Sequence, residues 1–120
     1  MKASDYCTIT TTTDSRENAE LIAQTLLKDE LVACVQASSI ESAYRWKGQI
    51  IHSKEIRLEL KTKVSLFTEV KEMIEKLHTY DVPEILMITM DDAKFDYLRW
   101  IDEVTKKPNY TETISEGVWQ

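Results

Sequence analysis

The sequence predicts a single α+β domain, built as a sandwich of one sheet and two helices with a further helix near the C-terminus. Two observations predict this class. Apolar residues recur at every second position in some segments and at helical spacing in others, and these segments follow the order strand, helix, strand, strand, helix, strand. The 120 residues contain no low-complexity stretch, so we assign residues 1–120 to one domain with its core over about residues 6–107. The tail over residues 108–120 shows no clear pattern.

The chain opens with a predicted strand and helix. Residues 6–12 are rich in β-branched side chains, which favour strands. Asp14 and Glu17 then have the spacing of a capping box, in which two side chains satisfy free backbone N–H groups at a helix start. The apolar residues between positions 19 and 27 follow at the spacing of one helical stripe, so we expect a helix that ends near residues 28–30.

A long hairpin is predicted next. Residues 31–40 favour a strand that can continue to Trp46, and residues 55–61 alternate apolar and charged side chains like a strand with one buried face. Residues 32–46 would span about 45 to 50 Å if fully extended. A compact domain of this length has a diameter of only roughly 35 Å. The hairpin must therefore bend or protrude, and a protruding tip would expose apolar side chains unless another copy covered them, so we expect self-association.

The second half of the chain repeats the alternation of helix and strand. Residues 66–77 return to helical spacing, and Pro83 ends that helix because the residue before a proline disfavours helical geometry. Residues 85–90 form a short apolar run, which we interpret as a strand buried on both faces. The aspartates at 91–92 can cap a third helix over residues 97–104. This order is that of a ferredoxin-like βαββαβ sandwich, whose sheet has one face covered by helices and one face free.

Charge and composition argue against several classes of function. The net charge of −6 offers no basic surface to phosphates, so we expect neither nucleic acid nor membrane as a partner. Gly48 and Gly117 are the only glycines, which excludes a glycine-rich phosphate loop, and we expect no enzymatic activity and no organic cofactor. The first residues carry no export signal, so we expect a cytoplasmic protein in which Cys7 and Cys34 stay reduced.

Five short segments, in this order and spacing, carry a family resemblance: Val-Ala-Cys-Val at 32–35, Tyr-Arg-Trp-Lys-Gly at 44–48, Leu-Lys-Thr at 60–62, Leu-His-Thr-Tyr-Asp-Val-Pro-Glu-Ile at 77–85 and Asp-Tyr-Leu-Arg-Trp-Ile at 96–101. Together they resemble the CutA family of divalent-cation-tolerance proteins, over a stretch from about Thr8 to Val104. The resemblance implies a ferredoxin-like protomer, related in fold to PII signalling proteins, in a tight homotrimer whose sheets join edge to edge.

The resemblance also implies a relation to copper, because some members of the family offer cysteine and histidine side chains to divalent copper. Cys34 and His78 stand at the matching positions and are the candidate ligands for Cu²⁺ or another divalent cation. Each also has a structural interpretation: Cys34 as a small buried apolar side chain, and His78 as a partner of a carbonyl or of the dipole at a helix end. His52 follows the hairpin turn and is expected to face solvent.

A second candidate site consists of Lys61, Tyr80 and Glu84, which stand next to predicted strands and could converge at a subunit junction. Trp46 from a neighbouring hairpin would complete it. The structural alternative is a Lys61–Glu84 ion pair that fixes the strand ends, with Trp46 as a packing residue.

Two functions therefore stay open, with a third beside them. The first is a homotrimeric divalent-cation-tolerance protein that binds copper or another divalent cation. The alternative is a PII-like module that senses a small metabolite at subunit clefts and passes that state to a protein partner, which an anion or nucleotide contacting Lys61 would favour. A structural scaffold would bind neither ligand.

Overall fold

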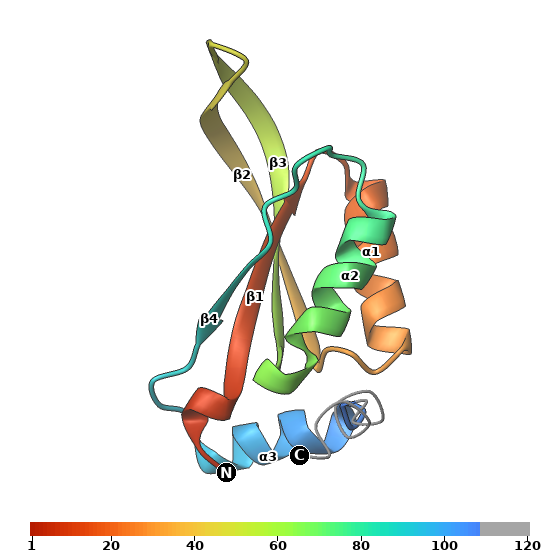
Figure 1. Cartoon of the computed structure of the whole chain (residues 1–120), viewed down its shortest axis with the longest axis vertical. Helices are drawn as coiled ribbons and strands as arrows, with labels where there is room; N and C mark the ends of the chain where they lie inside the picture. The colour runs from red at the N-terminus through yellow and green to blue at the C-terminus, as the bar shows by residue number, and fades with distance from the viewer. Residues whose placement is uncertain (109–120) are drawn as a thin grey trace, which may run out of the picture.

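The computed structural model describes residues 1–108 and shows a four-stranded sheet with two helices on one of its faces (Figure 1). The elements in chain order are η1 (Ala3–Asp5), β1 (Tyr6–Thr13), α1 (Arg16–Lys28), β2 (Cys34–Trp46), β3 (Gln49–Lys63), η2 (Val64–Leu66), α2 (Phe67–Leu77), β4 (Leu86–Thr89) and α3 (Phe95–Val104). The strands lie in the order β2-β3-β1-β4 and every neighbouring pair is antiparallel. The predicted ferredoxin-like fold is confirmed. The predicted tail begins at residue 108, and its remaining residues lie outside the described part.

The main core lies between the sheet and helices α1 and α2. Ile9 of β1 stands opposite Leu60 of β3, and both side chains are fully buried. Helix α1 adds Ile22 and Leu26 to this core, while Ile74 is among the residues that α2 adds. Full burial of one such side chain stabilises the fold by about 1.5 to 3 kcal/mol, so this layer accounts for much of the stability of the protomer.

Both predicted helix caps differ from the observed ones. Helix α1 is capped by Ser15, whose side chain accepts a hydrogen bond from the backbone N–H of Asn18 at 3.0 Å, so the capping box predicted from Asp14 is wrong by one residue. Helix α3 begins only at Phe95, with Lys94 in the cap position. The predicted aspartate cap of α3 is wrong because the Asp92 side chain accepts its bond from the next residue in the connecting loop.

Strand β4 is largely exposed, with only Met87 partly buried, which corrects the prediction of a strand buried on both faces. It lies at the edge of the sheet beside β1, and only Met87 packs against the core beneath the helices. Leu86 and Ile88 point to the opposite face and are 41% and 62% exposed. The two helices cover a single face of the sheet, so alternate residues of an apolar strand are left uncovered.

The hairpin of β2 and β3 protrudes beyond the body of the molecule, as one of the two expected outcomes (Figure 1). Strand β2 begins at Cys34, later than the predicted residue 31, and the pairing continues to Trp46 opposite Gln49. The turn residues Lys47 and Gly48 have φ angles of 50° and 79°, as a tight two-residue hairpin turn requires. We call the part of the hairpin from Ile40 to Glu55 the arm; the molecule is 48 Å long along its main axis.

The face of the sheet away from α1 and α2 is called the open face here. Strand alternation places on it Thr8, Thr10, Thr12, Cys34, Gln36, Ser38, Glu55, Arg57, Glu59, Lys61, Leu86 and Ile88. Helix α3 packs at one end of it, where Leu98 and Ile101 contact Tyr6 and Asp102 lies 3.5 Å from the Lys63 ammonium group. Within residues 1–108, no helix is long and apolar enough to cross a membrane.

Candidate functional site

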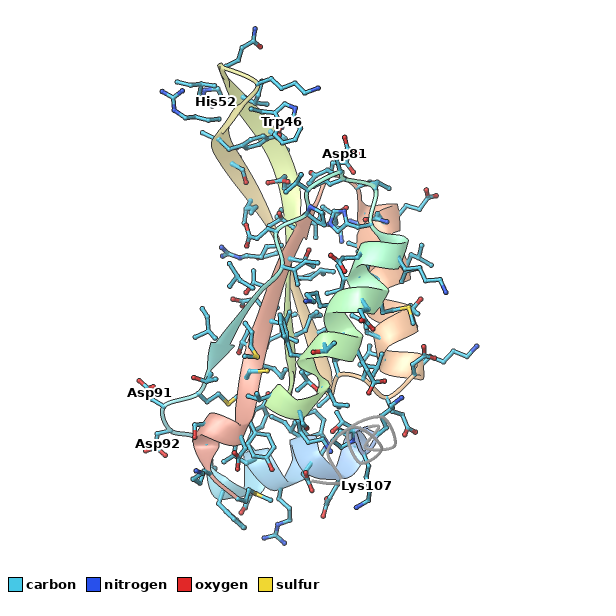
Figure 2. The ribbon with its side chains drawn as sticks, in the orientation of Figure 1. Trp46, His52, Asp81, Asp91, Asp92 and Lys107 are labelled. Carbon is cyan, nitrogen blue, oxygen red and sulfur yellow. The ribbon has the colours of Figure 1, made fainter. Side chains whose placement is uncertain are left out.

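A cavity of about 670 Å³ lies where the arm leaves the body of the molecule. Figure 2 shows Trp46 on the arm and Asp81 in the loop between α2 and β4, which forms the other side of this region. We call this cavity the arm pocket. Its lining residues come from β1, the two strands of the arm and that loop: Thr12, Ser42, Ala43, Tyr44, Trp46, Glu55, Thr79, Tyr80, Asp81, Val82 and Glu84.

Glu55 and Tyr80 join the two sides of the arm pocket. The Tyr80 hydroxyl donates a hydrogen bond of 2.6 Å to a carboxylate oxygen of Glu55, which is only 7% exposed. Burial raises the pKa of Tyr80 above its usual value, and the hydrogen bond to Glu55 and the negative charges of Glu55 and Asp14 raise it further. Tyr80 therefore keeps its proton at neutral pH and fixes the loop against the arm.

His78 connects the same loop to β1. Its Nδ1 accepts a hydrogen bond from the backbone N–H of Tyr80 at 3.1 Å, so in the neutral ring Nε2 is the donor to the Thr12 carbonyl, 2.8 Å away. The expected contact with the carbonyls of α2 is replaced, since Asn18 donates to the Leu77 carbonyl at 3.0 Å. Both ring nitrogens of His78 are thus engaged, and a metal could bind there only by displacing one of these bonds.

The structure does not bring Cys34 and His78 together within one protomer. Cys34 stands opposite Lys61, which in turn stands opposite Thr8 on β1. His78 bonds to Thr12, four residues further along β1, which is about 13 Å at roughly 3.3 Å per residue. In the described part of the chain, no three His, Cys, Asp or Glu side chains are arranged to hold a metal ion.

The second predicted group of residues is brought together only in part. Trp46, Tyr80 and Glu84 all line the arm pocket, and Trp46 comes from the arm of the same chain. Lys61 is not among the lining residues of the arm pocket, and its ammonium group donates to the Gln36 side chain at 2.9 Å elsewhere on the open face. The predicted Lys61–Glu84 ion pair is therefore wrong, because Lys61 finds its partner on the neighbouring strand.

Two polar residues of the arm pocket were missed by sequence reasoning. Glu55 belongs to the alternating run of β3 and was assigned to a solvated face, but the loop carrying Tyr80 covers it. Thr12 belongs to a run of threonines in β1 and is 7% exposed beneath the same loop. The alternation of charge along β3 is the one sequence signal that could have identified Glu55 as a candidate site residue. No local sequence pattern identifies Thr12 as one. The expectation that His52 is exposed is confirmed.

Comparison with known proteins gives one family. The family model described as CutA1 divalent ion tolerance protein matches residues 7–104. A divalent-cation tolerance protein CutA from Pyrococcus horikoshii is 45% identical over 97 residues, which cover 81% of this chain and 95% of that protein. The human protein CutA is 31% identical over 97 residues, or 80% of this chain and 54% of the human protein.

Solved structures agree with the family match. CutA1 from Pyrococcus horikoshii superimposes with a TM-score of 0.81 at 42% identity, covering 84% of this chain and 99% of that one. A protein from Archaeoglobus fulgidus, described as a periplasmic divalent cation tolerance protein CutA, gives a TM-score of 0.83 at 35% identity with the same coverage of 84% and 99%. The resemblance seen in the sequence is confirmed, and the chain belongs to the CutA1 divalent ion tolerance family.

Proposed function

We propose that this chain forms a homotrimer that contributes to the tolerance of divalent cations by binding copper or another divalent cation, without catalysing a reaction. The observation that carries the assembly is the uncovered apolar surface of the protomer. Ile50 on the arm is 65% exposed, and Ile88 at the edge of the sheet is 62% exposed. Apolar side chains beside unpaired strand edges favour pairing with another copy of the same chain.

Cys34 and His78 are the proposed metal ligands, and the trimer is what would make them sufficient. Thiolate and imidazole groups suit copper, but one protomer offers only one of each, and the two lie apart. A threefold axis brings three copies of one residue together, and Cys34 on the open face is better placed for this than His78. This part of the proposal rests on the family and on the chemistry of the thiol.

Two measurements test the proposal separately. Light scattering at micromolar concentration should give about three times the 14.0 kDa of one chain, and the mass of a single chain would refute the assembly. Calorimetric titration with copper should release or absorb heat in the parent protein and lose that signal in Cys34→Ser, with His78→Ala measured beside it. Absence of heat in the parent protein would remove the metal from the proposal.

A second candidate function is supported by the arm pocket. A concave site of about 670 Å³ with aromatic and acidic side chains is suited to a small molecule, as in a PII-like module that senses a metabolite and signals to a protein partner. Lys61 does not line the arm pocket, so a nucleotide bound by Lys61 would have to lie on another part of the open face. A scaffold would bind neither copper nor a small molecule.

The cytoplasmic location stays a prediction, to be tested by cell fractionation.

A further inference from the structure

The arm pocket has an unusual balance of charge. Its ionisable lining side chains are Glu55, Asp81, Glu84 and two tyrosines, and no lysine, arginine or histidine lines it. Within residues 1–108, no ion pair joins any of the three carboxylates to a basic side chain. The pocket therefore presents negative charge to whatever enters it.

Glu55 contributes most to this field, because it is the buried member of the three. Its carboxylate is 7% exposed and receives a hydrogen bond from the neutral Tyr80 hydroxyl, which compensates only part of a buried negative charge. A positive group that bound beside Glu55 would complete its compensation.

Aromatic rings give the pocket a second feature that favours cations. Tyr44, Trp46 and Tyr80 all line it, and the Trp46 side chain is 42% exposed. The Lys47 ammonium group lies 5.9 Å from the centre of the Trp46 ring, within the distance at which a cation and an aromatic face attract each other. Aromatic faces combined with carboxylates recognise organic ammonium groups, since the ring quadrupole attracts a cation and the ring surface packs against its carbon atoms.

Thr12 provides an independent indication of a ligand. It is 93% buried, it lines the arm pocket from β1, and its hydroxyl forms no hydrogen bond with any of residues 1–108. A hydroxyl in this position can accept a bond from an ammonium N–H or pair with a ligand hydroxyl. A metal ion fits less well, because the described chain holds no group of three ligating side chains and aromatic rings offer it nothing.

We infer that the arm pocket binds a small organic ammonium ion, with the cation between the rings of Trp46 and Tyr80 and the carboxylate of Glu55. This ligand differs from the metal of the first proposed function and gives a chemical class to the second, on which it rests. The site lies within one chain and uses neither Cys34 nor His78, so it is separable from copper binding.

Calorimetric titration of the full assembled chain tests this inference with matched probes. Choline and n-butylammonium should bind, whereas 3,3-dimethylbutan-1-ol, the neutral isostere of choline, should bind at least tenfold more weakly or not at all. Equal binding of the neutral alcohol would show an apolar cavity and overturn the inference. Binding of magnesium or copper at this site in place of the ammonium ions would overturn it as well, and so would no binding of either ammonium probe.

Matched variants locate the site. Trp46→Ala and Glu55→Gln should each weaken choline binding about tenfold, because each removes one attraction for the cation. Glu55→Gln keeps an oxygen that can accept the Tyr80 hydrogen bond. Trp100→Ala, which alters a similarly exposed tryptophan on α3, should leave the affinity unchanged. If Trp46→Ala and Glu55→Gln both bound choline like the parent, the arm pocket would not be the site.

The copper titration and the trimer mass are measured on the same preparation. A trimer that binds copper but no ammonium ion would refute this inference and leave the first proposed function standing. A chain that binds an ammonium ion but no copper would support this inference and would remove the metal from the first proposed function.

Discussion

The two faces of the sheet are formed by the same strands, yet they differ in composition and in what covers them. On the face beneath α1 and α2, Ile9 and Leu60 are fully buried. On the open face, Ile88 is 62% exposed, and Lys61 is held by a single hydrogen bond to Gln36. The contrast indicates that the helix-covered face supplies the folding energy of the protomer, whereas the open face and the arm are suited to interactions with other molecules.

Ile88→Lys should have the largest effect if the open face joins the proposed trimer. A charge at this position would be buried in the interface, so the mass from light scattering should fall from that of a trimer towards that of one chain, a change of up to about threefold. The far-UV circular dichroism should be unchanged. Leu21→Lys, at an exposed position of α1 on the outer side, is the matched control and should keep the parent mass. If the Ile88→Lys variant kept the mass of a trimer, β4 would not be part of the interface.

Leu26→Ala should have the largest effect on the fold itself. Leu26 is fully buried between α1 and the sheet, and its truncation should lower the free energy of unfolding by about 2 to 5 kcal/mol. The neighbouring Leu27 is 38% exposed, so Leu27→Ala should cost well under half as much. Urea titrations of both variants at the same protein concentration give the comparison. Similar losses for the two would mean that α1 is covered on both sides.

The pH dependence of the free energy of unfolding should reveal the burial of Cys7 on the helix-covered face. Burial raises the pKa of the Cys7 thiol to about 11, above its value of 9.0 in an exposed chain. Between these values the unfolded chain loses the proton while the folded chain keeps it, so unfolding becomes easier as the pH rises. The loss of free energy of unfolding should approach about 1.4 kcal/mol per pH unit.

Cys7→Ala isolates this contribution, because the tyrosines also titrate at high pH. The variant should show a shallower fall in the free energy of unfolding between pH 9 and pH 11 than the parent. Chemical denaturation at three pH values within this window is sufficient, with reducing agent present throughout. Parallel pH profiles for parent and variant would contradict the assigned burial of this thiol.

Much of the fold could be predicted from the sequence, because apolar spacing is a local property. The run between residues 19 and 27 and the alternation over residues 55–61 each identify an element without knowledge of the rest. The exposure of β4 could not be predicted in this way. An apolar run looks the same whether both faces are buried in one chain or one face is left uncovered, and only the tertiary arrangement decides between these cases.

The candidate site shows the same limit more strongly. Tyr80 and Glu84 were predicted to converge with Trp46 because they stand beside predicted strands, and the structure places all three around one pocket, with Trp46 from the same chain. Glu55 and Thr12 could not be predicted, because their burial depends on a loop that is distant in sequence and folds over them. Lys61 was predicted to pair with Glu84 on the basis of opposite charge, although a neighbouring side chain, Gln36, was nearer.

Ser15→Ala should have the smallest effect, and it decides which residue starts α1. The side-chain oxygen of Ser15 accepts the backbone hydrogen bond of Asn18, so its removal should lower the free energy of unfolding by about 1 kcal/mol. Asp14→Ala is the matched control, because a true capping box centred on Asp14 would make it the costlier change. Asp14 is exposed, so we expect its replacement to change stability by less than about 0.5 kcal/mol in urea titrations. A larger loss for Asp14→Ala than for Ser15→Ala would reverse the assignment and move the helix start back by one residue.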